Sequence, residues 1–517
     1  MIAVVNLLLF FDFLPSNHPM INRKLLLLYL FCMPCILLPA QGYFEYDAKC
    51  QSVYKAITSL QFTKAYSGIA SLKLESPDNL VVHHLENYLD FFYLYINGDQ
   101  KSFDRLKPRR AQRIEKVMAG DKDSPYQLYI QAEIYLQWAL IRLRFGEQLN
   151  GFMDINRANR LLEKNRRRFP DFIPNLKDLG ILHAMVGTIP DNYQWGVKLL
   201  TSLNGTIAQG RKELEQVVAY ADRNDFLFKE EARSMYAYLL MHLAKDEKAA
   251  WKVIRTSGLT PQTNPLHCFI MSNIAMRSGH NNEAIRILAN FKPQKERLAF
   301  PYLNYMLGLA KLRRLDRDAA PYFLKFLSEN KTPYYVKEAY QKLAWQSLII
   351  GEPGKYSAYM KACLNNGEAI AGGDKNAFRE AKSGHRPVEL LVEARLLFDG
   401  AYFQRAQELM KTKSQSFFPD KKDRLEYTYR LGRILHGLER WEEAIEQYET
   451  TIEQGQNESY FYACNAALQV GLIHETLGDR DLAQAYFKRC LSINPEEYKT
   501  GLHQQAKSGL ARVKGNK

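Results

Sequence analysis

The sequence lacks the short motifs that mark the common classes of enzyme. Its 517 residues contain no HExxH zinc-protease motif, no GxSxG nucleophile elbow and no P-loop. The segment GEPGK at residues 351–355 comes nearest to a P-loop, but it is too short to cradle a phosphate. We therefore predict a protein without catalytic activity, without a cofactor and without a metal site.

Cysteine is scarce, and its pattern does not indicate a disulfide-stabilised domain. The chain has seven Cys residues, and those after residue 40 are Cys50, Cys268, Cys363, Cys464 and Cys490. This set is odd and widely spaced, and no Cys/His spacing matches a zinc site. Cys464 and Cys490 fall on one expected helix pair and can be neighbours. We interpret Cys490 as a replacement for a small apolar residue, with a disulfide as the alternative.

Long apolar runs are confined to the N-terminus. Arg23 and Lys24 precede LLLLYLFCMPCILLPA, which ends at Ala40 and has the order of a secretory signal. We predict that residues 1–40 are a signal peptide, cleaved after Ala40 or Gly42, and that 1–19 are an upstream extension if Met20 is the true start. No later stretch is long and apolar enough to span a membrane. We expect an exported bacterial protein, periplasmic or outer-membrane-associated.

Acidic residues are outnumbered by basic ones. The chain has 70 Lys and Arg against 56 Asp and Glu, which gives a formal charge of +14. Basic residues cluster at 107–116 and 157–168. No nucleic-acid-binding motif accompanies them, so we do not expect a nucleic-acid partner. We interpret the clusters as solvated helix faces, or as an affinity for an anionic membrane surface or a glycan.

Sustained strand-like alternation is absent, and a helical repeat takes its place. In the segment 470–497, Gly471 stands twelve residues before Ala483, Phe487 four after it and Pro495 twelve after it. Similar segments recur upstream around small residues at Ala249, Ala284, Ala320, Ala406 and Ala444. Neighbouring anchors are 35 to 39 residues apart, except for one gap of 86 that leaves room for one more unit and a loop.

This spacing closely resembles that of the tetratricopeptide repeat (TPR) family, in which each repeat of about 34 residues is a pair of helices. The resemblance implies an all-α solenoid of antiparallel helix pairs, a TPR superhelix. We predict a less regular helical N-terminal domain with TPR-like hairpins over 41–228. A TPR array follows over 229–517, with a mobile loop near 365–387.

Glycine recurs at 187, 196, 205 and 210, in a segment that does not follow the repeat. The block is similar to a Gly-rich stretch of a eukaryotic TPR family associated with mitochondrial membranes and lipid droplets. Two interpretations stay open at this point: the glycines permit close helix packing and turns, or they mark a ligand or membrane contact. The residues alone favour the packing interpretation.

In TPR proteins the first helix of each repeat lines a concave groove. By this resemblance the groove residues are Tyr302, Tyr305, Leu309, Glu426, Tyr429, Arg433, His436 and Leu472. Such a mixture of groups suits an extended peptide or a partner helix. The clamp with which some TPR proteins hold a terminal carboxylate is not expected, since only Asn273 among the required positions matches.

We therefore predict a scaffold or adaptor of the bacterial cell envelope that binds a protein or peptide partner in the groove. The alternative is a membrane-surface or glycan-associated protein that binds through its N-terminal domain.

Overall fold

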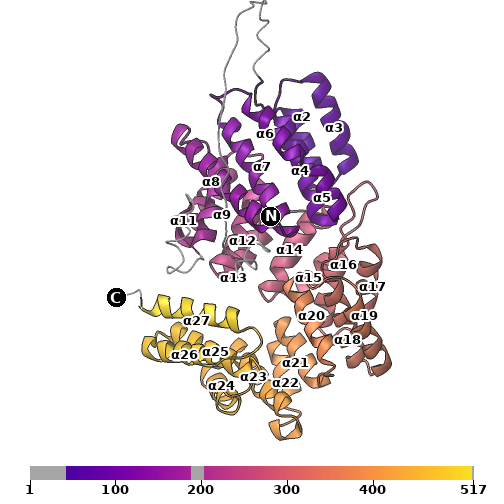
Figure 1. The fold of residues 1–517 in the computed structure, drawn as a ribbon, viewed down its shortest axis with the longest axis vertical. Coiled ribbons are helices and arrows are strands. Elements are labelled where there is room, and N and C mark those ends of the chain that lie inside the picture. The colour runs from indigo at the N-terminus through magenta and orange to yellow at the C-terminus, as the bar shows by residue number, and fades with distance from the viewer. Residues whose placement is uncertain (1–41, 188–202, 515–517) are drawn as a thin grey trace, which may run out of the picture. The chain divides into compact units, whose positions relative to one another are not determined.

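The computed structural model describes residues 42–187 and 203–514, and these ranges are folded almost wholly as helices (Figure 1). They contain no strand, only an isolated bridge between Tyr43 and Asn79. The predicted all-α class is therefore confirmed for these ranges. None of the helices in them combines the length and apolar character needed to cross a bilayer. The predicted signal peptide, residues 1–40, lies outside the described residues.

The chain divides into two compact units. Unit 1 comprises the chain up to Ile274 together with Asn290–Phe300, and unit 2 comprises Ala275–Ala289 and Pro301–Lys517. The predicted domain boundary at 228/229 marks where the repeat pattern becomes regular, and it stays a prediction.

Unit 1 is built from helices that alternate as first and second members of pairs, most clearly α7 with α8 and α9 with α11. Its helices are α2 (Ala48–Thr58), α3 (Phe62–Glu75), α4 (Val81–Asn97), α5 (Gln100–Leu106), α6 (Arg109–Met118), α7 (Pro125–Arg144), α8 (Gln148–Arg168), α9 (Pro174–Val186), α11 (Ile207–Arg223), α12 (Lys229–Tyr238), the π-helix η1 (Leu239–Leu243), α13 (Glu247–Arg255) and α14 (Pro265–Arg277). The last turn of α14 belongs to unit 2.

Short polar side chains begin several of these helices. The carboxylate of Asp47 accepts from the backbone N–H of Cys50 at the start of α2, and Asp99 and Asp246 cap α5 and α13 in the same way. Ser124 caps α7, which has Pro125 in its first turn. Each cap satisfies an N–H that has no partner within the helix.

The two ends of unit 1 meet. Beyond α2, the carbonyl of Leu60 accepts from the N–H of Leu298 at 2.8 Å, although the two residues are far apart in sequence. The side chains of Arg297 and Asn264 also donate to backbone carbonyls at the end of α2. Unit 1 therefore closes on itself through these contacts.

The described glycines of the Gly-rich segment pack α9 against α11. A Cβ on Gly210 would lie 2.1 Å from the carbonyl oxygen of Gly180, and one on Gly187 would lie 2.5 Å from the backbone nitrogen of Ile207. Gly205 has φ +150° and lies against the backbone of His183. These contacts agree with the interpretation of close helix packing. Gly196 lies outside the described residues.

Unit 2 continues the pairing in a more regular form. Its helices are α15 (Asn281–Ala289), α16 (Tyr302–Arg313), α17 (Ala320–Glu329), α18 (Val336–Ile349), α19 (Pro353–Asn365), α20 (Gly372–Ser383), α21 (Glu389–Asp399), α22 (Phe403–Met410), the 3₁₀ turn η2 (Gln415–Phe417), α23 (Lys421–Gly437), α24 (Trp441–Gly455), α25 (Tyr462–Leu477), α26 (Arg480–Ser492) and α27 (Lys499–Lys514). α27 packs on both helices of the last pair.

The small residues of the repeat lie where the helices of a pair cross. Ala444 and Ala483 are fully buried in α24 and α26. A Cβ on Gly432 would contact the Tyr448 ring, and a Cβ on Gly471 would contact the Phe487 ring. The glycine and the aromatic residue are separated by the same number of residues in both pairs. The two pairs therefore use equivalent crossings, as the repeat predicts.

Two anchors are displaced by a residue. Ala249, chosen from the spacing, is partly exposed, whereas Ala250 after it is fully buried in α13. Ala320 is partly exposed at the first position of α17, whereas Ala319 before it is fully buried. In the pair of α16 and α17, Phe323 faces Gly308, one position earlier than the aromatic residue of the later pairs. The corrected anchors are Ala250 and Ala319.

The segment 365–387, expected to be a mobile loop, contains the helix α20. Asp374 is fully buried, and its carboxylate accepts from the N–H groups of Tyr335 (2.7 Å) and Glu338 (3.0 Å) at the start of α18. Ala377 and Ala381, one turn apart, are buried as well. The loop prediction is corrected here: the Gly-rich and charged composition hides a helix that is ordered by capping its neighbour.

Candidate partner-binding face of unit 2

The first helices of successive pairs in unit 2 lie next to one another. α16 packs beside α18, α18 beside α21, α21 beside α23, and α23 beside α25. All residues predicted for the groove lie on three of these helices. They are Tyr302, Tyr305 and Leu309 on α16, Glu426, Tyr429, Arg433 and His436 on α23, and Leu472 on α25. We call the surface of these first helices the first-helix face.

The middle of the face is organised around Tyr429. Its hydroxyl oxygen accepts from Asn465 Nδ2 at 2.7 Å and from Arg433 Nη1 at 3.0 Å. The guanidinium of Arg433 lies 4.7 Å from the ring centroid of Phe398 on α21. Cation–π contact and these hydrogen bonds connect α21, α23 and α25 into one surface.

Glu426 supplies the acidic group of this surface. It accepts from the hydroxyl of Tyr462 at 2.7 Å and pairs with Arg430 one turn along α23. Burial by itself raises the pKa of Glu426, but Arg430 and the Tyr462 hydroxyl outweigh it and hold that pKa below the usual value. The group is therefore a carboxylate at neutral pH.

His436 lies at the end of α23 and is not a cation at neutral pH. Its ring packs edge-on against Trp441 with centroids 5.3 Å apart. Burial and the nearby Arg433 lower the pKa of His436 to about 4. It can contribute a neutral ring to the face but no positive charge.

Two predicted contact residues are buried and hold the face in place. Tyr305 is 2% exposed and packs edge-on against Phe323 and Phe326, and Tyr429 is 5% exposed. Rings this buried take part in the packing of the pairs, and the assignment of these two tyrosines as direct contacts stays a prediction. Leu472 and the other predicted residues are partly exposed.

Sequence reasoning missed the cluster around Trp345 on α18. Arg395 and Lys342 lie over its ring, at 4.8 Å and 3.8 Å from the centroid. The indole N–H donates to Glu380 on α20 at 2.7 Å. Arg395 keeps 38% of its side chain exposed. The gap of 86 residues left room for the unit that holds Trp345, but Glu380 and Arg395 reach it from α20 and α21, and the repeat spacing does not indicate these contacts.

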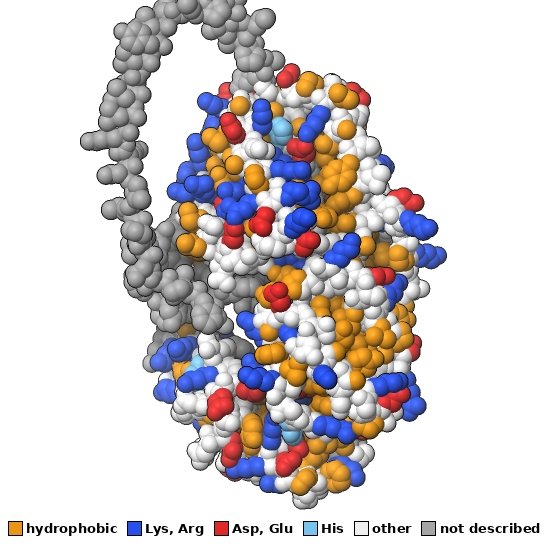
Figure 2. Space-filling view, turned by 45° about the vertical axis from the view of Figure 1, so that its right-hand side comes forward, with side chains coloured by type: hydrophobic (Ala, Val, Ile, Leu, Met, Phe, Trp, Pro, Cys, Tyr) orange, Lys and Arg blue, Asp and Glu red, His pale blue; other side chains and the backbone are white. Residues whose placement is uncertain are grey.

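The basic cluster at 107–116 in unit 1 is largely used in ion pairs. Arg110 and Arg142 both donate to Asp154, at 2.8 Å and 2.7 Å, and Arg113 donates to Asp90 at 2.7 Å. On the face shown in Figure 2, Lys and Arg side chains lie among Asp and Glu side chains. These pairs neutralise much of the cluster at 107–116. In the cluster at 157–168, Arg166 pairs with Glu213 and Arg168 with the exposed Asp123. That the chain has no nucleic-acid partner stays a prediction.

Within 42–187 and 203–514, no group of three or more His, Cys, Asp or Glu side chains is placed to hold a metal ion.

Comparison with known proteins identifies one family. Residues 401–496, which include α22 to α26, match a model described as tetratricopeptide repeat. A search of curated proteins gave no match.

Three solved structures are similar to the chain at low identity. The TPR domain of P58(IPK) is 13% identical with a TM-score of 0.21 and covers 82% of this chain and 98% of its own. The Cut9-Hcn1 hetero-tetramer of the APC/C is 12% identical with a TM-score of 0.24, covering 91% and 97%. Naa15/Naa10 bound to HypK-THB is 13% identical with a TM-score of 0.24, covering 90% and 65%.

Proposed function

We propose that this chain, which carries tetratricopeptide repeats over residues 401–496, is a protein–protein interaction scaffold without catalytic activity of its own. The observation that supports this most is the first-helix face of unit 2. It places aromatic, cationic, acidic and apolar groups side by side on adjacent helices, and several of them are partly exposed. Interfaces of proteins are enriched in aromatic residues and Arg in this way.

The partner is a protein segment that presents carboxylates and apolar side chains. Arg395 and Arg433 are held over Trp345 and Phe398, so their planar guanidinium groups are oriented before a partner arrives. A fixed guanidinium binds a carboxylate through two parallel hydrogen bonds with little loss of side-chain entropy. An extended peptide or a helix laid across the face reaches both cations.

The location of the function is a bacterial cell envelope. This part of the proposal rests on the order of basic, apolar and small residues before Ala40. N-terminal sequencing of the protein isolated from the periplasmic and membrane fractions tests it. A mature chain that starts at Gln41 or Tyr43 supports export, and a cytoplasmic chain that still carries residues 20–40 overturns it.

The binding proposal is tested by capture and cross-linking of the full chain in the envelope fraction. A variant with Arg395→Ala and Arg433→Ala should lose the partner that the wild type captures. Arg286→Ala is the matched control, because Arg286 is 61% exposed on the second helix α15 and pairs only with its neighbour Glu283.

A partner that binds the double variant as well as the wild type contradicts the assignment to the first-helix face, as does equal loss with Arg286→Ala. The alternative of binding to a membrane surface or a glycan through the N-terminal domain stays a prediction. The ion pairs of the basic cluster at 107–116 do not favour it.

A further inference from the structure

Unit 1 encloses a cavity of about 480 Å³. Its lining comes from the first helices α2, α4, α7, α9, α12 and α14, together with the segments that close the two ends of the unit. Cavities that hold small molecules have volumes of about 300–1,000 Å³ and join an apolar wall to a few convergent polar groups. The cavity of unit 1 has both features.

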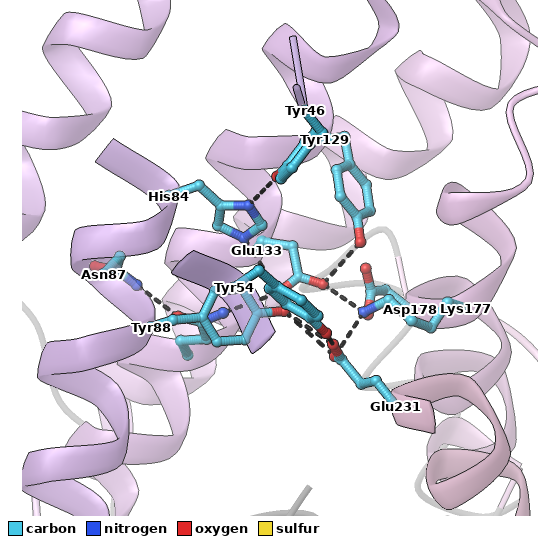
Figure 3. A network of polar contacts seen from close by, with 11 residues as sticks. Tyr46, Tyr54, His84, Asn87, Tyr88, Tyr129, Glu133, Lys177, Asp178 and Glu231 are labelled. Atoms are coloured by element: carbon cyan, nitrogen blue, oxygen red, sulfur yellow. Dashed lines mark hydrogen bonds and ion pairs between the residues drawn. The ribbon is translucent and has the colours of Figure 1, made fainter. Parts of the chain in front are cut away.

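The polar end of the cavity is a cluster around Lys177, which is fully buried (Figure 3). The Nζ atom of Lys177 donates to Glu133 Oε1 at 2.6 Å, to Asp178 Oδ1 at 2.8 Å and to Glu231 Oε1 at 2.9 Å. Glu133 comes from α7, Lys177 and Asp178 from α9, and Glu231 from α12. One ammonium group therefore faces three carboxyl groups.

The cluster holds more acidic than basic side chains. The carboxyl groups of Glu133, Asp178 and Glu231 face two basic groups, Lys177 and the buried His84, whose Nε2 atom lies 3.7 Å from Glu133. Burial and the Glu133 carboxylate raise the pKa of Asp178 well above its usual value. Burial alone would raise the pKa of Glu133, but the Lys177 ammonium outweighs it and holds that pKa well below the usual value.

Glu231 brings a carboxylate of this cluster to the cavity wall. Its carboxylate accepts from the hydroxyl of Tyr54 at 2.7 Å, from that of Tyr88 at 3.1 Å and from Lys177. A carboxylate offers about four acceptor positions, so three donors leave room for another. The side chain is 19% exposed, and Glu231, Tyr54 and Tyr88 all line the cavity.

Apolar side chains form another part of the wall. This part includes Phe91 and Phe92 on α4, Leu136 and Leu140 on α7, and Leu182 on α9. Leu136 and Leu140 are only partly buried, since they face the cavity and not a neighbouring helix. An apolar wall of this kind is stabilised by an apolar occupant, because contact with water costs free energy in proportion to the area exposed.

The mouth carries charges of both signs and does not decide the charge of an occupant. Lys55, Lys229 and Arg297 lie there with Asp225 and Glu230. Arg297 is already held by the carbonyl of Ser59. The charge of an occupant is set further in, where acidic side chains outnumber basic ones beside the phenol rings.

A purely structural role does not account for this arrangement. Replacing buried ion clusters by apolar side chains is often neutral or stabilising, and a buried charge without a partner is costly. A carboxylate at the wall of a cavity is offset when a cation enters, and aromatic rings such as those of Tyr54 and Tyr88 attract a cation as well.

We propose that the cavity of unit 1 binds a small organic cation with an ammonium group and an apolar body. The ammonium group lies at Glu231, beside the hydroxyl groups of Tyr54 and Tyr88, and the apolar body lies along Leu136 and Leu140. This site is separate from the first-helix face of unit 2 and does not depend on the proposed scaffold function.

The test is isothermal titration calorimetry of the full chain with three matched probes: 4-phenylbutylamine, 4-phenylbutan-1-ol and 4-phenylbutanoate. They differ only in the terminal group. The amine should bind about tenfold more tightly than the alcohol or better, and the carboxylate should bind more weakly still. No binding of the amine, or equal binding of amine and alcohol, overturns the proposal.

Two variants locate the site. Glu231→Gln removes the charge at similar shape and should reduce the preference for the amine over the alcohol by about tenfold. Glu75→Gln on α3 is the matched control, because 60% of the Glu75 side chain is exposed, it pairs with Lys49, and it does not line the cavity. An effect of the control as large as that of Glu231→Gln overturns the assignment.

Leu140→Trp fills the apolar part of the cavity away from the Lys177 cluster, so it keeps the test decisive if Glu231→Gln does not fold. It should abolish binding of the amine and the alcohol alike. Unchanged binding by the folded Leu140→Trp variant places the probe elsewhere and overturns the proposal.

Discussion

Substitution of Gly471 by Ala should destabilise the last repeat through a collision with one aromatic ring. The ring of Phe487 is fully buried between two glycines, Gly471 on α25 and Gly509 on α27. A Cβ on Gly471 would lie 2.7 Å from two of its ring carbons, and a Cβ on Gly509 would lie 2.5 Å from a third. Because both faces of the ring are occupied, it cannot move away from an added methyl group.

The magnitude follows from two opposing effects. Overpacking a buried site costs about 1–3 kcal/mol. Replacing Gly by Ala inside a helix stabilises the fold by about 1 kcal/mol, because the unfolded chain then has less backbone entropy to lose. Since the ring is held from both sides, the cost should fall near its upper end, and the net loss should be about 2 kcal/mol. Gly501→Ala in α27 is the control: nothing lies within 4 Å of its Cβ, so it should be neutral or slightly stabilising.

The assay is urea unfolding of the full chain combined with hydrogen exchange of the amides in α25, α26 and α27, which isolates the last repeat from the rest. Phe487→Leu costs stability by itself but makes room for the methyl group. The double variant with Gly471→Ala should therefore lose at least about 1 kcal/mol less than the sum of the single losses. Additive losses, or a Gly471→Ala variant as stable as Gly501→Ala, would refute the reasoning.

Three further predictions concern titration and thiol chemistry. Burial raises the pKa of Asp374 from 3.8 to about 7. The contribution of the protonated Asp374 to stability is therefore complete below pH 3.8 and is lost as the pH rises through about 7. Urea titrations across this range should show the decline in the wild type and not in Asp374→Asn. Burial lowers the pKa of His183, but hydrogen bonds to Glu163 and Glu213 outweigh burial and raise that pKa to about 9. The free energy of unfolding should therefore fall between pH 6.5 and 9, and the His183→Gln variant should lack this fall. Cys464 and Cys490 are free thiols with Sγ atoms 3.6 Å apart. Alkylation in denaturant should therefore label both thiols, and oxidation with diamide should join them in a disulfide. Peptide mapping that finds the disulfide before oxidation contradicts this prediction.

The sequence by itself determined the helical repeat. Gly471, Ala483 and Phe487 recur with their counterparts at a fixed spacing because each helix pair needs small side chains at its crossing and a ring beside them. That requirement is local, within one pair, so a periodic pattern records it. The positions of the first-helix residues on α16, α23 and α25 followed from the same period.

Only the tertiary structure decided which groups meet inside each unit. Tyr54 and Glu231, which form a hydrogen bond in the Lys177 cluster, are 177 residues apart. The helix α20 is placed by the cap that Asp374 gives to α18, and Tyr305 is buried by the ring of Phe323 on α17 and that of Tyr335 just before α18. These contacts depend on the rotation from one helix pair to the next, summed along the solenoid. Small residues at a crossing allow that rotation but do not fix its angle. The repeat of residue types therefore does not predict the cavity or its charge.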